Sequence, residues 1–143
     1  MRHSLFVYGD DERMVEKMAP FLREGLATEE RAVVVIEPRK WEHLAGALGP
    51  DAEDVLYIER DSFYTRPEAA IAGYDSTLRQ FVREGAHAVR AFAELPRCET
   101  EADWNLWLAY EAMVNRALAH HPLWVICGYD TREVPGSLST GTE

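Results

Sequence analysis

The 143-residue sequence contains only two cysteines, Cys98 and Cys127, and neither forms a CxxC pair or a spacing typical of zinc sites. We therefore expect two free thiols, with Cys127 as a small residue of the core. The sequence also lacks the run of about 18 apolar residues that a membrane-spanning helix needs. Acids follow the first eight residues where a secretion signal would have its cleavage site, so we expect a cytoplasmic protein that does not contact a membrane.

Positive charge is scarce in this sequence. Fifteen Lys and Arg residues stand against 25 Asp and Glu residues, which gives a formal net charge of −10. A surface of this charge repels nucleic-acid phosphates and anionic lipids. We expect no direct contact with nucleic acid, so an effect on transcription would need a partner protein or a separate domain.

Motifs that mark catalytic and cofactor sites are also missing. The sequence has no GxxxxGKS/T loop, no GxGxxG, no GxSxG and no HExxH. His120 and His121 end a predicted helix, where positive charge suits the helix dipole and a surface position is expected. The sequence therefore predicts no catalytic residue, no cofactor and no metal site.

Strand and helix patterns alternate along the whole chain. Short apolar runs predict strands at residues 4–8, 31–37, 55–59, 87–95 and 123–129. Val33 to Ile36 form a β-branched block without polar alternation, which is typical of a strand covered on both faces. Helical spacing follows each of the first four strands, with a loop at 60–66 before the third helix, and Gly25 is expected to end the first helix.

This alternation predicts one three-layer α/β domain over residues 1–134. We expect a mostly parallel, Rossmann-like five-stranded sheet with helices on both faces and the strand order 3-2-1-4-5. Residues 135–143 are predicted to be a flexible tail or the start of a linker, because they offer too few apolar side chains for packing.

The helix that begins near Trp104 carries two polar residues on its apolar side. Spacings of three and four place a single stripe along it. Its members are Trp104, Trp107, Leu108, Glu111, Val114, Asn115 and Leu118. A carboxylate in such a stripe is costly unless it is paired or hydrogen-bonded. Glu111 and Asn115 therefore predict either internal hydrogen bonds or a ligand cavity.

Further polar residues stand where the predicted strands end. Ligands of open parallel sheets bind beyond the carboxyl ends of the strands. Those ends carry Tyr8, Asp10, Glu94, Tyr129 and Asp130, which we predict to be ligand-binding. Two structural alternatives stay open, because Asp10 has the position of a helix cap and Asp130 that of an Asx turn.

Four segments resemble the MEDS domain of methanogen and methylotroph sensory proteins, which include the dichloromethane dehalogenase regulator. These are residues 3–8 with the acids after them, residues 20–25, Tyr110-Glu111 with Asn115, and residues 127–130. The resemblance implies a sensory module for simple hydrocarbon derivatives on a scaffold similar to degenerate RecA-like or KaiC-like domains, commonly fused to an output domain. Its motif positions are His3, Tyr8, Glu94, Trp104, Glu111, Asn115, Cys127, Tyr129 and Asp130, of which His3 and Cys127 are secondary candidates.

Three functional hypotheses follow from these patterns. In the first, a non-enzymatic sensor binds a small organic molecule between the sheet edge and the Trp104 helix, with residues 60–66 as a mobile cover, and signals through a partner protein, an output domain or a homo-oligomer. In the second, Glu94 or Glu111 is the general base of a small enzyme. In the third, the chain is an interaction module without a ligand.

Overall fold

The computed structural model describes residues 1–133, so the tail predicted for residues 135–143 lies outside the described part of the chain. The strands are β1 (Arg2–Tyr8), β2 (Arg31–Ile36), β3 (Val55–Glu59), β4 (Val89–Glu94) and β5 (Leu123–Asp130). The helices are α1 (Asp11–Ala27), α2 (Pro38–Leu48), η1 (Gly49–Asp54, a 3₁₀ helix), α3 (Arg60–Phe63), α4 (Pro67–Arg83) and α5 (Glu101–Ala117). Among residues 1–133 no helix combines the length and the apolar character that crossing a membrane requires.

The five strands form one entirely parallel sheet in the order β1-β5-β4-β2-β3. The predicted order 3-2-1-4-5 is wrong, because β1 lies at the edge beside β5 instead of in the centre. Its Leu5 and Val7 are 66% and 64% exposed, so β1 is buried on one face only. The other edge is β3, as the short third strand predicted.

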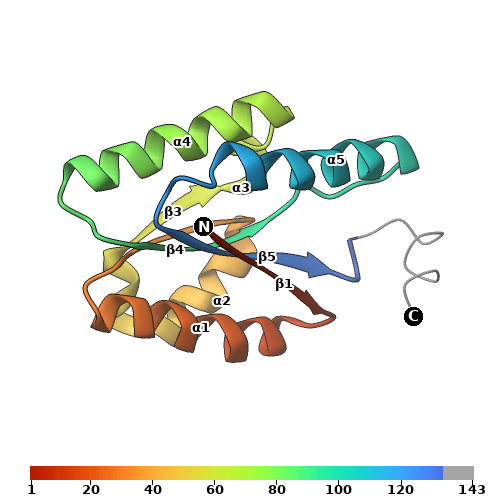
Figure 1. Cartoon of the computed structure of the whole chain (residues 1–143). Helices are drawn as coiled ribbons and strands as arrows, with labels where there is room; N and C mark the ends of the chain where they lie inside the picture. Colours follow the sequence, from red (N-terminus) through yellow and green to blue (C-terminus); the bar gives the residue numbers. More distant parts are fainter. Residues whose placement is uncertain (134–143) are drawn as a thin grey trace.

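Helices cover both faces of the sheet, which confirms the predicted three-layer α/β fold (Figure 1). Helices α1 and α2 lie on one face, and α4 and α5 lie on the other. Alternate residues of β2 enter separate cores, with Val33 and Val35 toward α4 and α5 and Val34 and Ile36 toward α1 and α2. This two-sided burial explains the continuous apolar block in the sequence.

Local sequence signals set several helix boundaries. The Asp10 carboxylate accepts a hydrogen bond from the backbone N–H of Arg13 at 2.7 Å and caps α1, and Thr100 caps α5 in the same way. Gly25 does not end α1, contrary to the prediction. The helix continues to Ala27, and Gly25 instead makes room for Arg90, since a Cβ atom at this position would lie 2.6 Å from its Cδ.

The segment predicted as a mobile cover is packed into the domain. Residues Arg60–Phe63 form the single-turn helix α3. The side chain of Arg60 is 3% exposed, and Tyr64 belongs to the core beside α4 and α5. The prediction of a loop at residues 60–66 is therefore wrong for Arg60–Phe63, and the mobility of this segment stays a prediction.

The central strand β4 is entirely buried although it contains two charged residues. The Arg90 guanidinium donates to the backbone carbonyl of Phe21 at 3.0 Å and to Glu30 at 3.3 Å, and it lies against the rings of Phe21 and Trp124. Glu94, at the carboxyl end of the strand, is satisfied by a separate cluster. These partners explain how a strand with two charges occupies the middle of the sheet.

Candidate functional site

The predicted site residues form two clusters on opposite faces of the sheet. Side chains of a strand alternate between its faces, so Tyr129 and Asp130 point in opposite directions. Tyr8, Glu94 and Asp130 meet on the side of α1 and α2. His3, Cys127 and Tyr129 face α5, which contributes Trp104, Glu111 and Asn115. Asp10 belongs to neither cluster, because its carboxylate caps α1.

The first cluster, which we call the Lys40 cluster, consists of Lys40, Tyr8, Glu94, Asp130, Glu133 and Arg60. The Lys40 ammonium lies 2.8 Å from Asp130 Oδ2, 3.1 Å from Glu94 Oε1 and 3.4 Å from Glu133 Oε2. The Tyr8 hydroxyl donates to Glu94 Oε2, and Arg60 Nη1 lies 3.0 Å from Glu133. Lys40 is completely buried, and Glu94 is 1% exposed.

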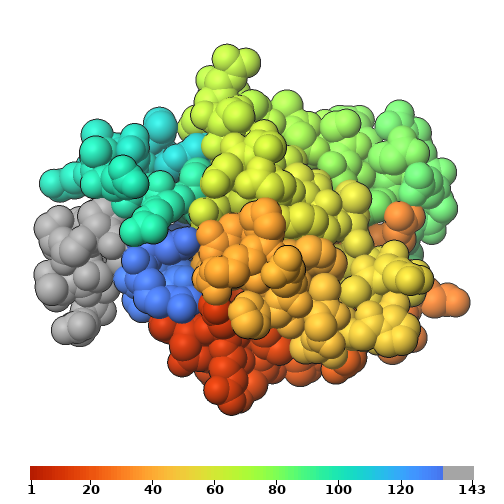
Figure 2. All heavy atoms as spheres, turned by 180° about the vertical axis from the view of Figure 1, so that it is seen from behind, coloured from red at the N-terminus to blue at the C-terminus, as the bar shows by residue number. Residues whose placement is uncertain are grey.

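This cluster lies where the winding of the sheet reverses. The chain passes from β2 to β3 in one direction and from β4 to β5 in the other, so the reversal falls between β2 and β4. Open α/β sheets bind ligands at such a point. Here the position is filled by the ion pairs of the protein's own Lys40. In Figure 2 the end of β5 (blue) emerges between α1 (red) and α5 (cyan), with α2 (orange) beside it.

Burial and the neighbouring charges act in opposite directions on the pKa values of this cluster. It raises the pKa of Glu94 to about 7, although Lys40 and Tyr8 act in the opposite direction. Burial alone would lower the pKa of Lys40, but the surrounding carboxylates outweigh it and the pKa is raised. For Asp130, burial is outweighed by hydrogen bonds from Arg132 and Lys40, which lower the pKa. Both oxygens of Glu94 already accept hydrogen bonds within the protein, Oε2 from Tyr8 and Oε1 from Lys40.

A small void adjoins the Lys40 cluster at the carboxyl edge. Its lining includes Glu94, Trp104, Tyr129 and Asp130, and its volume is about 20 Å³. That space suits one water molecule and is too small for an organic ligand.

The sequence did not identify Lys40, Arg60 or Glu133 as residues of the Lys40 cluster. One signal was available for Lys40, which stands in the first turn of α2, four residues after the end of β2. The amino end of a helix dipole disfavours a cation. A lysine at this position therefore indicates carboxylate partners from elsewhere in the fold. The Asp130 carboxylate also accepts from the backbone N–H of Arg132 at 2.9 Å, as the Asx-turn alternative predicted.

The second cluster, which we call the α5 site, consists of His3, Glu111, Asn115 and Cys127. His3 Nδ1 hydrogen-bonds the side-chain oxygen of Asn115. His3 Nε2 lies 2.9 Å from Cys127 Sγ and 3.2 Å from Glu111 Oε2, and Sγ lies 3.6 Å from the same carboxylate oxygen. Three elements thus bring an imidazole, a thiol and a carboxylate together.

Glu111 is only half satisfied. Its Oε2 faces His3 and Cys127, whereas its Oε1 is buried without any hydrogen-bond partner among the described residues. The side chain is 12% exposed. The sequence predicted either internal hydrogen bonds or a ligand cavity for Glu111, and neither describes it completely. Oε2 belongs to an internal network, whereas Oε1 accepts no hydrogen bond from the described residues.

The position of Glu111 on α5 differs from the predicted stripe. The buried residues of this helix are Trp107, Tyr110 and Val114, whereas Leu108 is 41% exposed. Glu111 and Asn115 therefore lie on the flank of the buried side, toward β1 and β5. Both cysteines are free thiols, as predicted.

Burial and Glu111 shift the pKa values of the other titratable groups in and beside the α5 site. The hydrogen bond that His3 donates to Glu111 is the largest influence on the pKa of His3. It raises this pKa above the ordinary value of 6.5, because the carboxylate stabilises the imidazolium. Burial raises the pKa of the Cys127 thiol, which is therefore neutral. Burial and Glu111 together raise the pKa of Tyr129, whose ring meets that of Trp104 edge-on with a centroid distance of 6.0 Å.

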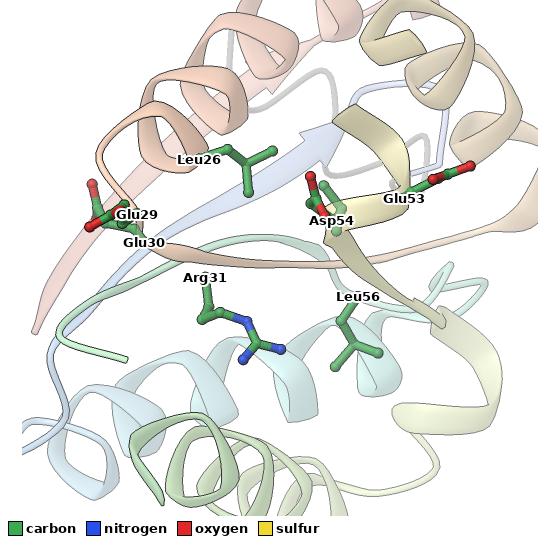
Figure 3. Close-up of a pocket in the computed structure, with 8 residues that line it drawn as sticks. Leu26, Glu29, Glu30, Arg31, Glu53, Asp54 and Leu56 are labelled. Atoms are coloured by element: carbon green, nitrogen blue, oxygen red, sulfur yellow. The ribbon is translucent and has the colours of Figure 1, made fainter. Parts of the chain in front are cut away.

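A much larger hollow, of about 540 Å³, lies at the opposite edge of the sheet (Figure 3). Glu29 and Glu30 stand on one side of it and Glu53 and Asp54 on the other. None of the predicted site residues lines this hollow. It is open and acidic, and nothing in its lining points to a particular ligand.

A family model matches residues 2–141, nearly the whole chain, and its description is MEDS, the methanogen/methylotroph, DcmR sensory domain. The chain belongs to the MEDS family. This confirms the resemblance drawn from the sequence and assigns a sensory role to the domain. No curated protein matches the chain significantly.

Proposed function

We propose that this MEDS domain is a non-enzymatic sensor of a small organic molecule, a simple hydrocarbon derivative, which binds at the α5 site. The observation that carries the proposal is the buried Oε1 of Glu111, which has no partner among residues 1–133. An unsatisfied buried acceptor costs about 1–3 kcal/mol. A ligand that donates a hydrogen bond to this oxygen recovers that free energy.

The surroundings of Glu111 favour a ligand with one polar end and an apolar remainder. Leu108 lies one helical turn before Glu111, and Leu5 follows His3 on the same face of β1. Leu5 and Leu108 are largely exposed, so they offer apolar surface near the polar cluster. An alcohol or amine of a short hydrocarbon combines the hydrogen-bond donor and the apolar body that these residues require.

The Lys40 cluster supports a non-enzymatic role at the sheet edge. Glu94 was the first candidate for a general base, and its raised pKa is the property that such a base needs. Its two oxygens, however, are engaged by Tyr8 and Lys40, and the adjoining void has room for one water. A substrate would have to break this ion pair to reach Glu94. Glu111 as a general base stays a prediction.

The exposed edge of β1 is the surface through which we propose that the signal leaves the domain. A ligand changes an output only by binding one conformation better than another. The α5 site joins α5 to β1 through His3, so a shift of α5 on ligand binding is transmitted to that strand. Leu5, Val7 and the backbone groups of β1 that pair with no strand among residues 1–133 then offer a signalling partner or output domain a place to bind.

Calorimetric titration tests the proposed binding site. The probes are short alcohols, amines and chlorinated alkanes, and the proteins are the wild type and Glu111→Gln. The matched control is Glu101→Gln, which changes an exposed residue at the start of the same helix. We expect Glu111→Gln to weaken the binding of a probe about tenfold or more, which is about 1.4 kcal/mol, and the control to leave it unchanged. Equal affinities of all three proteins, or binding of no probe, would overturn the proposal.

A further inference from the structure

We propose that the α5 site binds a divalent cation of the zinc type, with His3 Nε2, Cys127 Sγ and the Glu111 carboxylate as its ligands. The inference deepens the proposed function and rests on it in one respect, because the cation would be the group that the sensed molecule contacts. An imidazole nitrogen, a thiolate and a carboxylate are the ligands that Zn²⁺ takes in proteins. Sulfur among them favours a borderline-soft cation over Mg²⁺ or Ca²⁺.

The distances within the cluster are close to those of a metal site. Zinc–ligand bonds at tetrahedral angles place a nitrogen and an oxygen about 3.3 Å apart, and place sulfur about 3.5–3.6 Å from either. The observed separations are 3.2 Å from Nε2 to Oε2 and 3.6 Å from Sγ to Oε2. The third, from Nε2 to Sγ, is 2.9 Å and has to widen by about 0.6 Å. Of the three separations, it is the one that metal binding has to change most.

Asn115 supplies the second shell that such a site needs. Its side-chain oxygen can only accept, so it fixes the proton of His3 on Nδ1. Metal-binding histidines donate their other ring N–H to an oxygen in the same way. In the neutral ring, Nε2 then directs its lone pair toward Cys127 and Glu111. A nitrogen lone pair facing a carboxylate oxygen at 3.2 Å requires a proton or a cation between them.

The unused oxygen of Glu111 also fits this assignment. With Oε2 on the metal, Oε1 is available as a second contact to the cation or as an acceptor for a bound molecule. Three protein ligands leave a tetrahedral zinc ion with an open fourth position, which is how zinc sites that bind small molecules are built. The side chains of His3 and Glu111 are 13% and 12% exposed, so the position is accessible from solvent. A hydroxyl, thiol or amine of the sensed molecule is the group that would occupy it.

A second group of potential metal ligands has to be distinguished from this one. Asp75, on α4, and His120 and His121, between α5 and β5, have potential ligand atoms within 4.8 Å of one another. This group contains no sulfur, and Asp75 already pairs with His121 at 2.8 Å and with Arg79 at 2.7 Å. A measurement that detects metal–sulfur bonds therefore reports on the α5 site alone.

Titration of the chelator-treated full chain with Co²⁺, followed by competition with Zn²⁺, tests the inference. Bound Co²⁺ absorbs visible light, and a thiolate ligand adds a charge-transfer band in the near ultraviolet. We expect this band to saturate at one equivalent and to disappear when Zn²⁺ is added. Cys127→Ser should lose the band and weaken Co²⁺ binding at least tenfold. Cys98→Ser is the matched control, since Cys98 hydrogen-bonds the Pro96 carbonyl away from the cluster, and should keep both.

Two further variants extend this test. Asn115→Ala should weaken Co²⁺ binding about 10–100-fold while the thiolate band remains, as expected for a second-shell residue. Circular dichroism reports whether each variant folds, and Glu111→Gln replaces Cys127→Ser if the latter does not. Absence of the band in the wild type, or an unchanged band in Cys127→Ser, would overturn the inference.

The metal inference and the proposed function can fail separately. If a short alcohol or amine binds the metal-free protein in a Glu111-dependent manner while Co²⁺ does not bind, the cation inference is wrong and the proposed function stands. If Co²⁺ binds through Cys127 but no organic probe binds with or without the cation, the sensory ligand is wrongly assigned and the metal site stands.

Discussion

Replacing Lys40 by Met should destabilise the domain more than any surface substitution. The variant keeps the aliphatic chain of the lysine and removes the ammonium group that separates Glu94 from Asp130. Because the Lys40 side chain is fully buried and those of Glu94 and Asp130 are each 1% exposed, water cannot replace the lost charge. Breaking a buried ion pair in this way costs about 3–5 kcal/mol.

That cost is a large part of the 5–15 kcal/mol by which domains are typically stable. At roughly 2–4 °C per kcal/mol, the melting temperature should fall by roughly 6–20 °C. The effect should also depend on pH. The pKa of Glu94 is raised to about 7 in the fold from an ordinary value of 4.5, so the folded state binds the proton more tightly than the unfolded state does. Loss of Lys40 raises this pKa further, so the carboxyl ionises at a lower pH in the folded wild type than in the folded variant. The destabilisation relative to the wild type should therefore grow as pH rises above about 7.

Urea unfolding of the wild type and Lys40→Met at pH values around 5 and 8 measures both effects. The control is Lys17→Met, which alters the other lysine of the chain at an exposed position of α1. Adding Glu94→Gln to Lys40→Met removes the orphaned carboxylate and should recover at least about 1 kcal/mol. A loss below about 1 kcal/mol, or one that is equal at both pH values, would refute the buried network described here.

Two further predictions concern the α5 site and the β1 edge. The raised pKa of His3 means that its ion pair with Glu111 stabilises the fold fully below pH 6.5 and is lost as pH rises through the folded-state pKa. In the presence of a chelator, the difference in unfolding free energy between wild type and His3→Gln should therefore shrink from pH 6 to about pH 9, and a difference that grows instead contradicts the assignment. At the edge, Leu5→Lys should change the unfolding free energy by less than about 0.5 kcal/mol, since Leu5 is 66% exposed, but should reduce binding of the signalling partner or output domain in a pull-down with that protein. Unaltered partner binding would exclude this surface.

The sequence was sufficient to predict the elements of the fold but not their arrangement. Uninterrupted apolar runs placed all five strands within two residues of their observed bounds. The strand order depends on which strands pair, and paired strands can stand more than a hundred residues apart in the sequence. Periodicity is a local property and does not identify such partners. β1 pairs with β5, so the first and last strands of the sequence are neighbours.

For the candidate site, too, the sequence predicted individual residues but not their partners. Residue chemistry singled out Glu94, Glu111, Asn115 and Asp130, because polar groups at buried positions need partners. The partners themselves come from distant segments, and their identity depends on packing. His3 illustrates this, since it stands near the amino end of β1, away from the carboxyl ends where ligands were expected, and yet lies 3.2 Å from Glu111 of α5. No spacing rule in the sequence relates residues 3, 111 and 127 to each other.

Native mass spectrometry of the wild type and Glu111→Gln, purified side by side from cells that naturally produce the chain, tests the sensory site most directly. The proposed function predicts that the wild type carries the added mass of a small organic molecule, beyond that of any bound metal ion, and that Glu111→Gln does not. The same organic mass on both proteins, or on neither, would contradict it.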